Sequence, residues 1–538
     1  METAARKIAI SIMFTIAVSI GIYSYLIFTL GLLGLLYRES VIIFSLLYAA
    51  VVVLAYKRKI IYTLKLIRIG KTPNVNFGFV LITLIVSLAL VNLIGAFGPE
   101  LGFDALWYHL TLPKIYLVNH DILHIPGGLL YYSSMPKLTE MIYVGALSFG
   151  NELVVKLVHF SFGIISLIAL YNLSRNFLNK TYSLITVLIF YSNLVVAWQS
   201  TTAYIDLART FFEIMALFGF INWWKSKNKK WLMESAVMMG LAISTKLLAI
   251  GSLIIFSALI ALFFFYHKRS AISFAKSLSV YWFISLLIPL PWFVFSFIHT
   301  GNPVYPFFTN LYKIGLNLQF INPFIHRSDS ISIVYIIIPF VFPFVFTKFK
   351  SGMRIVSLYS ILAFAIWYLT PKTDWGRFIM PYLPAFSIVC SAIILTIKKY
   401  NFLKNLAIGL VILSALITMF YRLVASAKYI SVILGIETKN KFLTDHLNFS
   451  FGDFYDTDGY FSKNITRNNK VLLYGFHNLY YVDFPFIDSS WVKKGDVFDY
   501  IAVQNSVIPK RFSYWNLVYY NKKTNVKLYS LGGQKWVY

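Results

Sequence analysis

The feature that most constrains this chain is a series of long apolar runs. Runs of roughly 16 to 29 residues recur through its first 424 positions, separated by short charged breaks. A helix of about 20 apolar residues crosses the hydrocarbon core of a bilayer. Only helices and closed barrels satisfy their backbone hydrogen bonds in lipid, and a barrel would show short alternating strands instead of continuous runs. The sequence therefore predicts a polytopic α-helical membrane protein and excludes a soluble globule.

About thirteen membrane-spanning helices follow from these runs. The predicted spans are residues 8–36, 41–56, 77–97, 155–174, 181–198, 204–224, 231–247, 249–266, 278–298, 331–346, 355–369, 378–397 and 404–424. The first run is too long, and lacks a small-residue cleavage site, to be a removable signal peptide. We expect it to stay in the membrane as an anchor.

The positive charge is placed in a way that argues against nucleic acid as a partner. The chain carries a formal net charge of +27, but its Lys and Arg clusters alternate with the apolar runs, so they all fall on one side of the membrane. By the positive-inside rule that side is the cytoplasm. We therefore expect a cytoplasmic N-terminus and, after an odd number of crossings, an extracytoplasmic C-terminus, in either the plasma membrane or the ER membrane.

The composition divides the chain into three parts. Residues 1–76 hold two leading helices and a basic cytoplasmic connector, residues 77–424 form a helical body, and residues 425–538 form a tail with short β-leaning runs such as "KVLLYGF", "LYYVDFPFI", "FDYIAVQN" and "VKLYSLG". The tail predicts a small extracytoplasmic α/β or mostly β domain. Cys390 is the only cysteine, so no intramolecular disulfide supports that domain.

The stretch "FGPELGFDALWYHLTLPKIYLVNHD" gathers polar groups where the third predicted span leaves the membrane. Its Leu106, Leu110 and interleaved aromatic residues suit a helix lying at the membrane interface. Aromatic neighbours can lower the dielectric around Asp104 and let its carboxylate act as a general base. Tyr108 and His109 beside it are candidate substrate-binding residues. The structural alternative is that Asp104 is a solvated acid or the N-cap of this helix.

A second set of charges falls at the same predicted depth. Asp206 opens the sixth span, with Arg209 and Glu213 on the same helical face. Charges inside a span normally turn inward toward a partner or cavity, so Asp206 and Arg209 could also form a purely structural pair. Lys246 and Arg377 lie at extracytoplasmic boundaries, where each could snorkel or hold a phosphate. Two cations beside two carboxylates suggest one site for an anionic lipid headgroup.

Metal binding has weak support in the sequence. Several histidines map to the extracytoplasmic side, including His109, His120 and His326, but no HxxxH or CxxC spacing appears. A dedicated transition-metal site is therefore not supported. A divalent cation such as Mg²⁺ or Mn²⁺ between carboxylates remains possible.

Five motifs, in their order along the chain, resemble the GT-C superfamily of integral-membrane glycosyltransferases. They are "GFDALWYHLTLPKIYL", "AYIDLARTFFEIMALFGF", "GLAISTKLLAI", "TGNPVYPFF" and "GRFIMPYLP". The family 39 type, which includes protein O-mannosyltransferases and the aminoarabinose transferase of lipid A, is the most similar. The resemblance covers roughly residues 77–400, and it rests on the order of the motifs, not on a single specific one.

The resemblance implies a polyprenyl-phosphate sugar as donor and an acidic active-site residue in the first extracytoplasmic loop, which Asp104 matches. Residue 105 is alanine where an Asp-Glu pair is frequent, which leaves no second carboxylate there. Asp206 matches the acid at the start of a later helix, and Lys246 and Arg377 resemble the cations near the lipid phosphate. The expected reaction is one inverting displacement, with Asp104 as general base and Asp206 orienting the acceptor or Arg209. The acceptor could be a lipid, a protein or a glycan.

Three other functions remain open at this point. A transporter or flippase of a lipid-linked sugar would also need charged groups and lipid contact, although transporter sites usually lie near the bilayer midplane. A transferase or polymerase of whole oligosaccharides would favour a larger extracytoplasmic domain. A non-catalytic receptor or scaffold would tolerate loss of Asp104.

Overall fold

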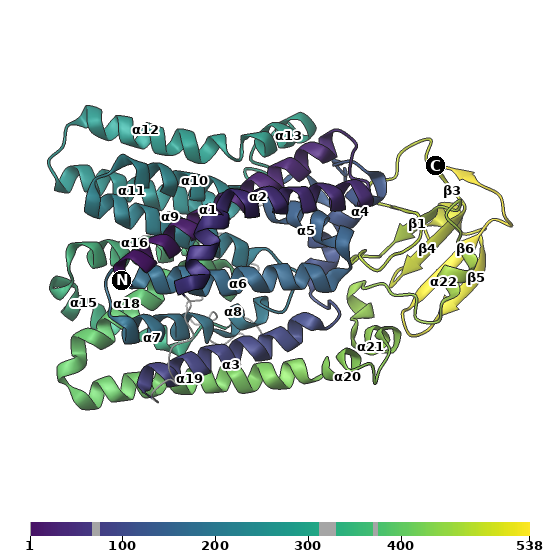
Figure 1. Ribbon diagram of the computed structural model, residues 1–538. Helices are drawn as coiled ribbons and strands as arrows, with labels where there is room; N and C mark the ends of the chain where they lie inside the picture. The colour runs from purple at the N-terminus through teal and green to yellow at the C-terminus, as the bar shows by residue number, and fades with distance from the viewer. Residues whose placement is uncertain (1, 67–75, 311–329, 370–374) are drawn as a thin grey trace.

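The computed structural model consists of a helical body with a small sheet domain at one end (Figure 1). It describes residues 2–66, 76–310, 330–369 and 375–538. Eight helices in these ranges are long and apolar enough to cross a membrane, or nine if the bent pair near residue 288 is one span. The protein is thus an integral membrane protein. The full number of about thirteen crossings stays a prediction.

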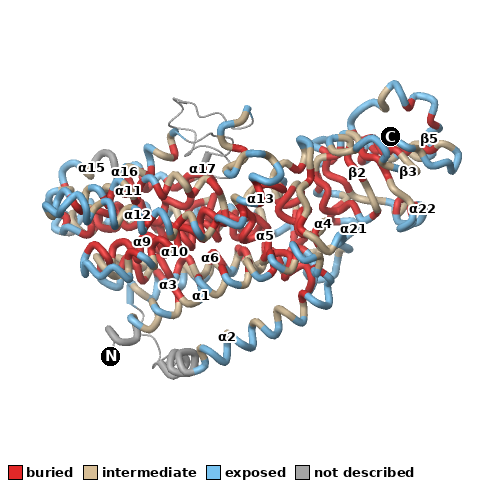
Figure 2. The backbone as a smooth tube through the Cα atoms, turned by 90° about the horizontal axis from the view of Figure 1, so that it is seen from above, coloured by how far each residue is buried: buried red, intermediate tan, exposed pale blue. Residues whose placement is uncertain are grey.

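The first two helices form a pair at the side of the body. They are α1 (Glu2–Leu32) and α2 (Arg38–Leu66). Figure 2 shows α2 standing apart from the buried interior, and Leu46, Val51 and Leu54 are exposed along it. Such an apolar surface is compatible with lipid as its surroundings.

The body is built from helices that mostly run parallel to one another between the two ends of the molecule. They are α3 (Phe77–Phe97), α6 (Glu152–Ser174), α7 (Lys180–Tyr191), α8 (Leu194–Gln199), α9 (Asp206–Ser226), α10 (Lys229–Thr245), α11 (Ile250–Tyr266), α12 (Ala271–Leu287), α13 (Leu290–Thr300), α15 (Ile337–Val345), α16 (Ser351–Leu369), α17 (Trp375–Ile379), α18 (Leu383–Thr396) and α19 (Asn401–Ala427). Short turns between them are η3 (Leu247–Ala249), η4 (Ile333–Ile336), η5 (Phe346–Lys348), η6 (Met380–Tyr382) and η7 (Ile397–Lys399).

Helix α9 is the centre of this body, because it is buried on nearly every side. It packs along α10, with which it forms an antiparallel hairpin, and along α6. Its first residue, Asp206, lies near the C-terminal domain, because Tyr204 just before it accepts from the backbone N–H of Asp104, and Phe103 stacks on His477. The opposite end of the helix carries Lys225 and, at the C-cap, Lys227. At 1.5 Å per residue its 21 residues span about 30 Å, which is the thickness of a hydrocarbon core.

The segment between α3 and α6 folds against the sheet domain. It contains η1 (Ala105–His109), which is one turn of π-helix, then α4 (Thr111–Asn119), η2 (Tyr131–Ser134) and α5 (Leu138–Phe149). Leu106, Leu110 and Tyr116 are fully buried in protein contacts. The C-terminal domain and α5 cover these apolar residues, and the position of this segment at the membrane interface stays a prediction.

The C-terminal domain is a mixed α/β structure, as predicted. Its elements are α20 (Ile430–Ile433), α21 (Lys439–His446), η8 (Phe449–Phe451), α22 (Tyr460–Asn464), β1 (Val471–Tyr474), β2 (Phe486–Asp488), β3 (Val497–Phe498), β4 (Tyr500–Gln504), η9 (Lys510–Phe512), β5 (Asn516–Asn521), β6 (Val526–Ser530) and β7 (Trp536–Val537). The main sheet has the order β2-β1-β4-β6-β5, parallel from β2 to β4 and antiparallel at β6 and β5. Strands β3 and β7 form a separate antiparallel pair.

Several polar contacts fasten this domain to the α3–α6 segment. Lys114 on α4 donates to the backbone oxygens of Tyr480 and Val482 at 2.7 and 2.9 Å. The hydroxyl of Tyr481 donates to the backbone oxygen of Glu100 at 3.0 Å. Residues 479–485 were expected to be part of a strand, but they form this irregular connection between β1 and β2 and dock onto the body instead.

The predicted spans, the domain limits and the two loops can now be compared with the structure. Each predicted span overlaps at least one helix, and several overlap two or more adjacent helices. The domain limits 1–76, 77–424 and 425–538 stay predictions. Most of the second large loop, with His326, and part of the basic connector lie outside the described residues.

Candidate functional site

Asp104 is held in place by the unusual backbone that follows it. The π-turn η1 is closed by the hydrogen bond from the Leu110 N–H to the Ala105 oxygen at 2.9 Å, and π-turns often mark functional sites. Asp104 makes no capping hydrogen bond with its side chain. Its backbone N–H donates to the hydroxyl of Tyr204 at 3.1 Å. The alternative of a helix N-cap is therefore not supported, because the carboxylate is engaged elsewhere.

Three interruptions of helices bring the other charges to the same place. Asp206 is in the first turn of α9, where the helix dipole favours a negative charge. Lys246 lies in extended backbone between α10 and η3. Arg377 belongs to the short α17, and Pro381 and Pro384 follow it at the starts of η6 and α18, where a helix tolerates proline.

These four residues form one network of ion pairs, which we call the carboxylate cluster: Asp104, Asp206, Lys246 and Arg377. Arg377 Nη1 lies 2.7 Å from Asp104 Oδ2, and its Nε lies 3.5 Å from Asp206 Oδ2. Lys246 Nζ lies 2.6 Å from Asp206 Oδ1. The arginine therefore links two carboxylates that are about one hundred positions apart in the sequence, and the cluster carries two positive and two negative charges.

Aromatic rings surround the carboxylate cluster. The Arg377 guanidinium lies 5.0 Å from the centre of the Tyr204 ring, and Lys246 Nζ lies 5.0 Å from that of Phe378. The Tyr108 hydroxyl donates to Asp104 Oδ2 at 2.9 Å. The Tyr108 ring stacks on Tyr132 with a centroid distance of 3.6 Å. Such rings exclude water, so the charges interact more strongly than they would at an open surface.

The protonation of Asp104 follows from two opposing effects. Burial by itself would raise the pKa of this carboxyl, but the charge of Arg377, together with the hydrogen bonds from Arg377 and Tyr108, holds the pKa below its ordinary value. Burial and the neighbouring Asp104 charge raise the pKa of Tyr108. At neutral pH Asp104 is therefore an ionised acceptor and Tyr108 a protonated donor.

Two of the predicted site residues do not join the cluster. Arg209 was considered as a partner of Asp206, but its Nε binds Glu213 at 2.7 Å and its Nη2 donates to Tyr382 at 3.3 Å, one turn further into the body. The Asp206–Arg209 pair is wrong, because Asp206 turns toward the cations on other helices. His109 is buried beside the site, and its Nδ1 lies 2.8 Å from Glu140 Oε1.

Two residues that were not predicted contribute to the site. Glu100 accepts from the N–H groups of Gly102 and Ala203, both at 2.6 Å, and so fastens the chain before Asp104 to the chain before Asp206. His477 of the C-terminal domain lies 4.8 Å from the ring of Phe103 and 4.3 Å from that of Trp107. Glu100 could have been predicted from the sequence as an acidic residue at a turn of the chain. His477 is far away in the sequence, and only the folded structure brings it to the site.

The donor set does not fit the divalent cation that was considered possible. The Asp104 and Asp206 oxygens already face Arg377 and Lys246, so a dication would be placed against two positive charges. Within the described ranges, no group of three or more His, Cys, Asp or Glu side chains could hold a metal ion. We therefore derive no step that uses a metal.

Comparisons with known proteins agree with the fold. A family model described as dolichyl-phosphate-mannose-protein mannosyltransferase matches residues 142–295. The crystal structure of ArnT from Cupriavidus metallidurans bound to undecaprenyl phosphate superposes with a TM-score of 0.57 at 12% identity, over 84% of this chain and 97% of that chain. Its apo structure gives 0.56 with the same identity and coverage. This chain has the GT-C fold.

Other comparisons add less. The S. cerevisiae protein O-mannosyltransferase Pmt1-Pmt2 complex bound to the sugar donor matches with a TM-score of 0.33 at 17% identity, over 43% of this chain and 34% of that chain. No curated protein matches by sequence. The resemblance to the GT-C superfamily that the five motifs indicated is confirmed. In this GT-C fold the carboxylate cluster lies beside the C-terminal domain, because Phe103, next to Asp104, stacks on His477.

Proposed function

We propose that this protein is a glycosyltransferase that moves a sugar from a polyprenyl-phosphate donor to an extracytoplasmic acceptor. The proposal rests mainly on the Arg377 bridge between Asp104 and Asp206, with Lys246 beside it, at the end of a GT-C fold body. It is supported by the family model of mannosyltransferases and by the ArnT structure, whose bound molecule is undecaprenyl phosphate.

In the proposed reaction, Asp104 removes the proton from the acceptor hydroxyl or amine. The acceptor atom then forms a bond to the anomeric carbon while the bond from that carbon to the phosphate oxygen breaks. Polyprenyl phosphate leaves with the bonding electrons, and Lys246 and Arg377 stabilise its negative charge. A single displacement predicts inversion at the anomeric carbon.

Arg377 and Lys246 can bind carboxylates and a phosphate at the same time, because each side chain has more N–H donors than a single partner uses. A guanidinium has five N–H groups in a planar fork, and an ammonium has three. As Arg377 turns part of its charge toward the donor phosphate, it lowers the pKa of Asp104 less, and Asp104 becomes a stronger base. Asp206 keeps Lys246 in position from the opposite side.

The test uses purified protein in lipid nanodiscs with a panel of radiolabelled polyprenyl-phosphate sugars. We expect one donor to release polyprenyl phosphate with transfer of the sugar, and Asp104→Asn to abolish the release. Asp121→Asn, an acid of the same α3–α6 segment outside the carboxylate cluster, serves as the matched control and should react like wild type. If every donor binds without being consumed while a labelled donor crosses the membrane of proteoliposomes, the protein is a transporter and the proposal fails.

A further inference from the structure

A second charged region lies at the opposite end of the body, between α1, α9 and α10. It lines a cavity of about 1200 Å³. Four cations line it, which we call the basic cluster: Arg6, Lys7, Lys225 and Lys230. Glu234 is the only acidic side chain among the described residues that line this cavity, and it lies 3.9 Å from Lys230. The cavity therefore has a clear excess of positive charge.

The basic cluster has donors that the protein itself does not fully use. Arg6 Nη2 donates to the Asn172 oxygen and to Asn176 Oδ1, both at 2.8 Å. Among the described residues, however, the buried Arg6 Nε and Asn176 Nδ2 find no hydrogen-bond partner. Lys225 donates to the Asn176 oxygen at 3.0 Å and lies over the ring of Phe177 at 4.5 Å. Like charges and unused buried donors at one place are costly unless an anion satisfies them.

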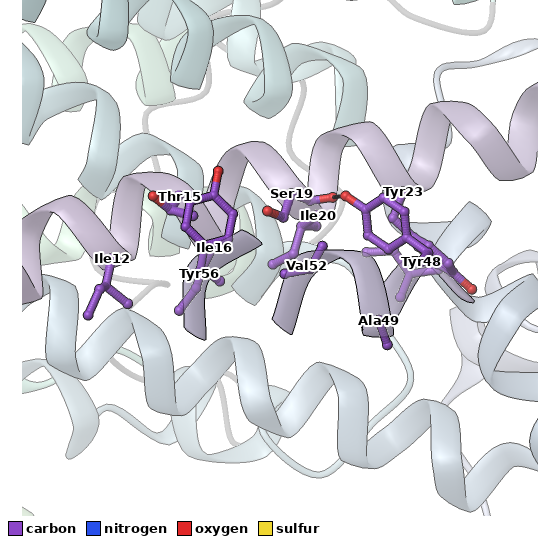
Figure 3. A pocket seen from close by; sticks show the side chains of 11 residues that line it. Ile12, Thr15, Ile16, Ser19, Ile20, Tyr23, Tyr48, Ala49, Val52 and Tyr56 are labelled. Carbon is purple, nitrogen blue, oxygen red and sulfur yellow. Dashed lines mark hydrogen bonds between the residues drawn. The ribbon is translucent and has the colours of Figure 1, made fainter. Parts of the chain in front are cut away.

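An apolar groove continues from this cavity between α1 and α2 (Figure 3). Its volume is about 400 Å³, and Ile16, Ile20 and Val52 are among the side chains that line it. Thr15 and Tyr56 line both the cavity and the groove, so the two spaces are adjacent. Tyr48 closes the far part of the groove by donating to the Ser19 oxygen at 2.7 Å, which leaves its ring to face the apolar space.

We propose that this region binds one anionic glycerophospholipid, with its phosphate among the basic cluster and an acyl chain in the groove between α1 and α2. Charge complementarity selects the headgroup, because a zwitterionic lipid would bring a second cation next to Arg6 and Lys225. The adjacent groove selects a long chain, because its lining is apolar. Basic pockets between membrane helices at the Lys- and Arg-rich end are typical places for such headgroups. The lipid would hold α2, whose residues are mostly exposed, against α1.

The proposal is tested by native mass spectrometry of the full-length protein after delipidation in detergent. The probes are phosphatidylglycerol and phosphatidylcholine with matched acyl chains. We expect phosphatidylglycerol to bind more tightly, and Arg6→Gln combined with Lys225→Gln to weaken it by about tenfold or more, because charge-assisted hydrogen bonds are lost. Arg269→Gln combined with Lys276→Gln removes two exposed cations from the same end of the body outside the cavity, and this control should bind normally.

A second variant tests the proposal even if the Arg6→Gln and Lys225→Gln variant does not fold. Val52→Trp fills the apolar groove without changing charge, and it should also weaken phosphatidylglycerol binding. Val53→Trp, whose side chain lies on the exposed face of α2, is its control. Equal binding of the two phospholipids, or unchanged binding in both test variants, overturns the proposal. Displacement of bound phosphatidylglycerol by a polyprenyl phosphate, lost in the Arg6→Gln and Lys225→Gln variant, would assign the site to that lipid instead.

Discussion

The two charged regions at opposite ends of the α9–α10 hairpin differ in how their charges are balanced. In the carboxylate cluster two cations face two carboxylates at 2.6 to 3.5 Å. In the basic cluster four cations share a cavity with Glu234 alone among the described residues that line it. The charges of the carboxylate cluster compensate one another, which suits the exchange of one partner for a substrate in the proposed reaction. The excess positive charge of the basic cluster suits the proposed lipid phosphate as a lasting ligand.

The largest effect is expected from removing one charge of the carboxylate cluster. Asp104→Asn removes the proposed base, and Arg377→Gln removes the bridge, so each should lower the transfer rate by about 10² to 10⁴-fold. The double variant restores the charge balance but neither function. We expect it to regain thermal stability relative to Arg377→Gln while it stays inactive.

The measurements are transfer of a radiolabelled sugar and the unfolding temperature in detergent, on the same preparations. Activity that returns in the double variant would show that the two residues matter only as an ion pair. The Asp104 role in proton transfer would then be wrong.

The second prediction concerns one lysine from each region. Lys246→Met leaves Asp206 with weaker compensation in a buried place and should destabilise the protein by about 3 kcal/mol. Lys225→Met removes a charge that is repelled by Arg6, so its effect on stability should be small, within about 0.5 kcal/mol. Thermal unfolding followed by tryptophan fluorescence compares the two variants. Similar losses in both would contradict the difference in charge balance.

The sequence was enough to predict the membrane helices and the residues of the carboxylate cluster. A helix that crosses lipid needs a long apolar run, so the spans can be recognised directly in the sequence. Asp104, Asp206, Lys246 and Arg377 each lie where a span begins or ends, and counting the crossings places all four at one face. The structure brings these four together, whereas their catalytic roles stay a proposal.

The sequence could not decide which charges pair. Arg209 was considered for Asp206, three positions away, but the i to i+4 spacing let it pair with Glu213, while partners from α17 and the end of α10 took Asp206. The π-turn after Asp104 adds a residue to one turn of helix, so α-helical spacing does not tell which side chain of this segment faces Asp104. The role of His109 in substrate binding stays a prediction.

The C-terminal domain was the hardest part to predict in detail. Short strands depend on long-range pairing, and their apolar residues look like those of an interface. Residues 479–485 have the pattern of a strand but pack on the α3–α6 segment. Strand β5, which is not among the β-leaning runs quoted from the sequence, lies at the edge of the sheet with mostly exposed residues. The contribution of His477 to the site depends on this docking and has no local signal.

The third prediction uses the protonation of Asp104. Because the pKa of Asp104 is lowered, its carboxylate is lost only as the pH falls below its ordinary pKa of about 4, so the acidic limb of the activity profile should lie below that value. Tyr108→Phe removes a hydrogen bond that lowers this pKa and should move the limb upward by about one pH unit. The profile of kcat/KM against pH measures the shift. Tyr132→Phe is the control. It keeps the stacked ring and the Tyr108 hydroxyl, so the acidic limb of its pH profile should stay where it is in the wild type.

The smallest expected effect concerns the C-terminal domain. A variant of His477 distinguishes a domain that takes part in the reaction at the carboxylate cluster from one that only covers the cluster. His477 lies against Phe103 and Trp107, which flank Asp104 along the chain. If these rings form a wall for the acceptor, His477→Ala should raise the acceptor KM by about fivefold, the value of one aromatic contact, and leave the donor KM unchanged. His446→Ala is the control, because its ring stacks on Phe442 within the C-terminal domain. An equal rise in both KM values would instead mean that His477 supports the position of η1, and therefore of Asp104 itself.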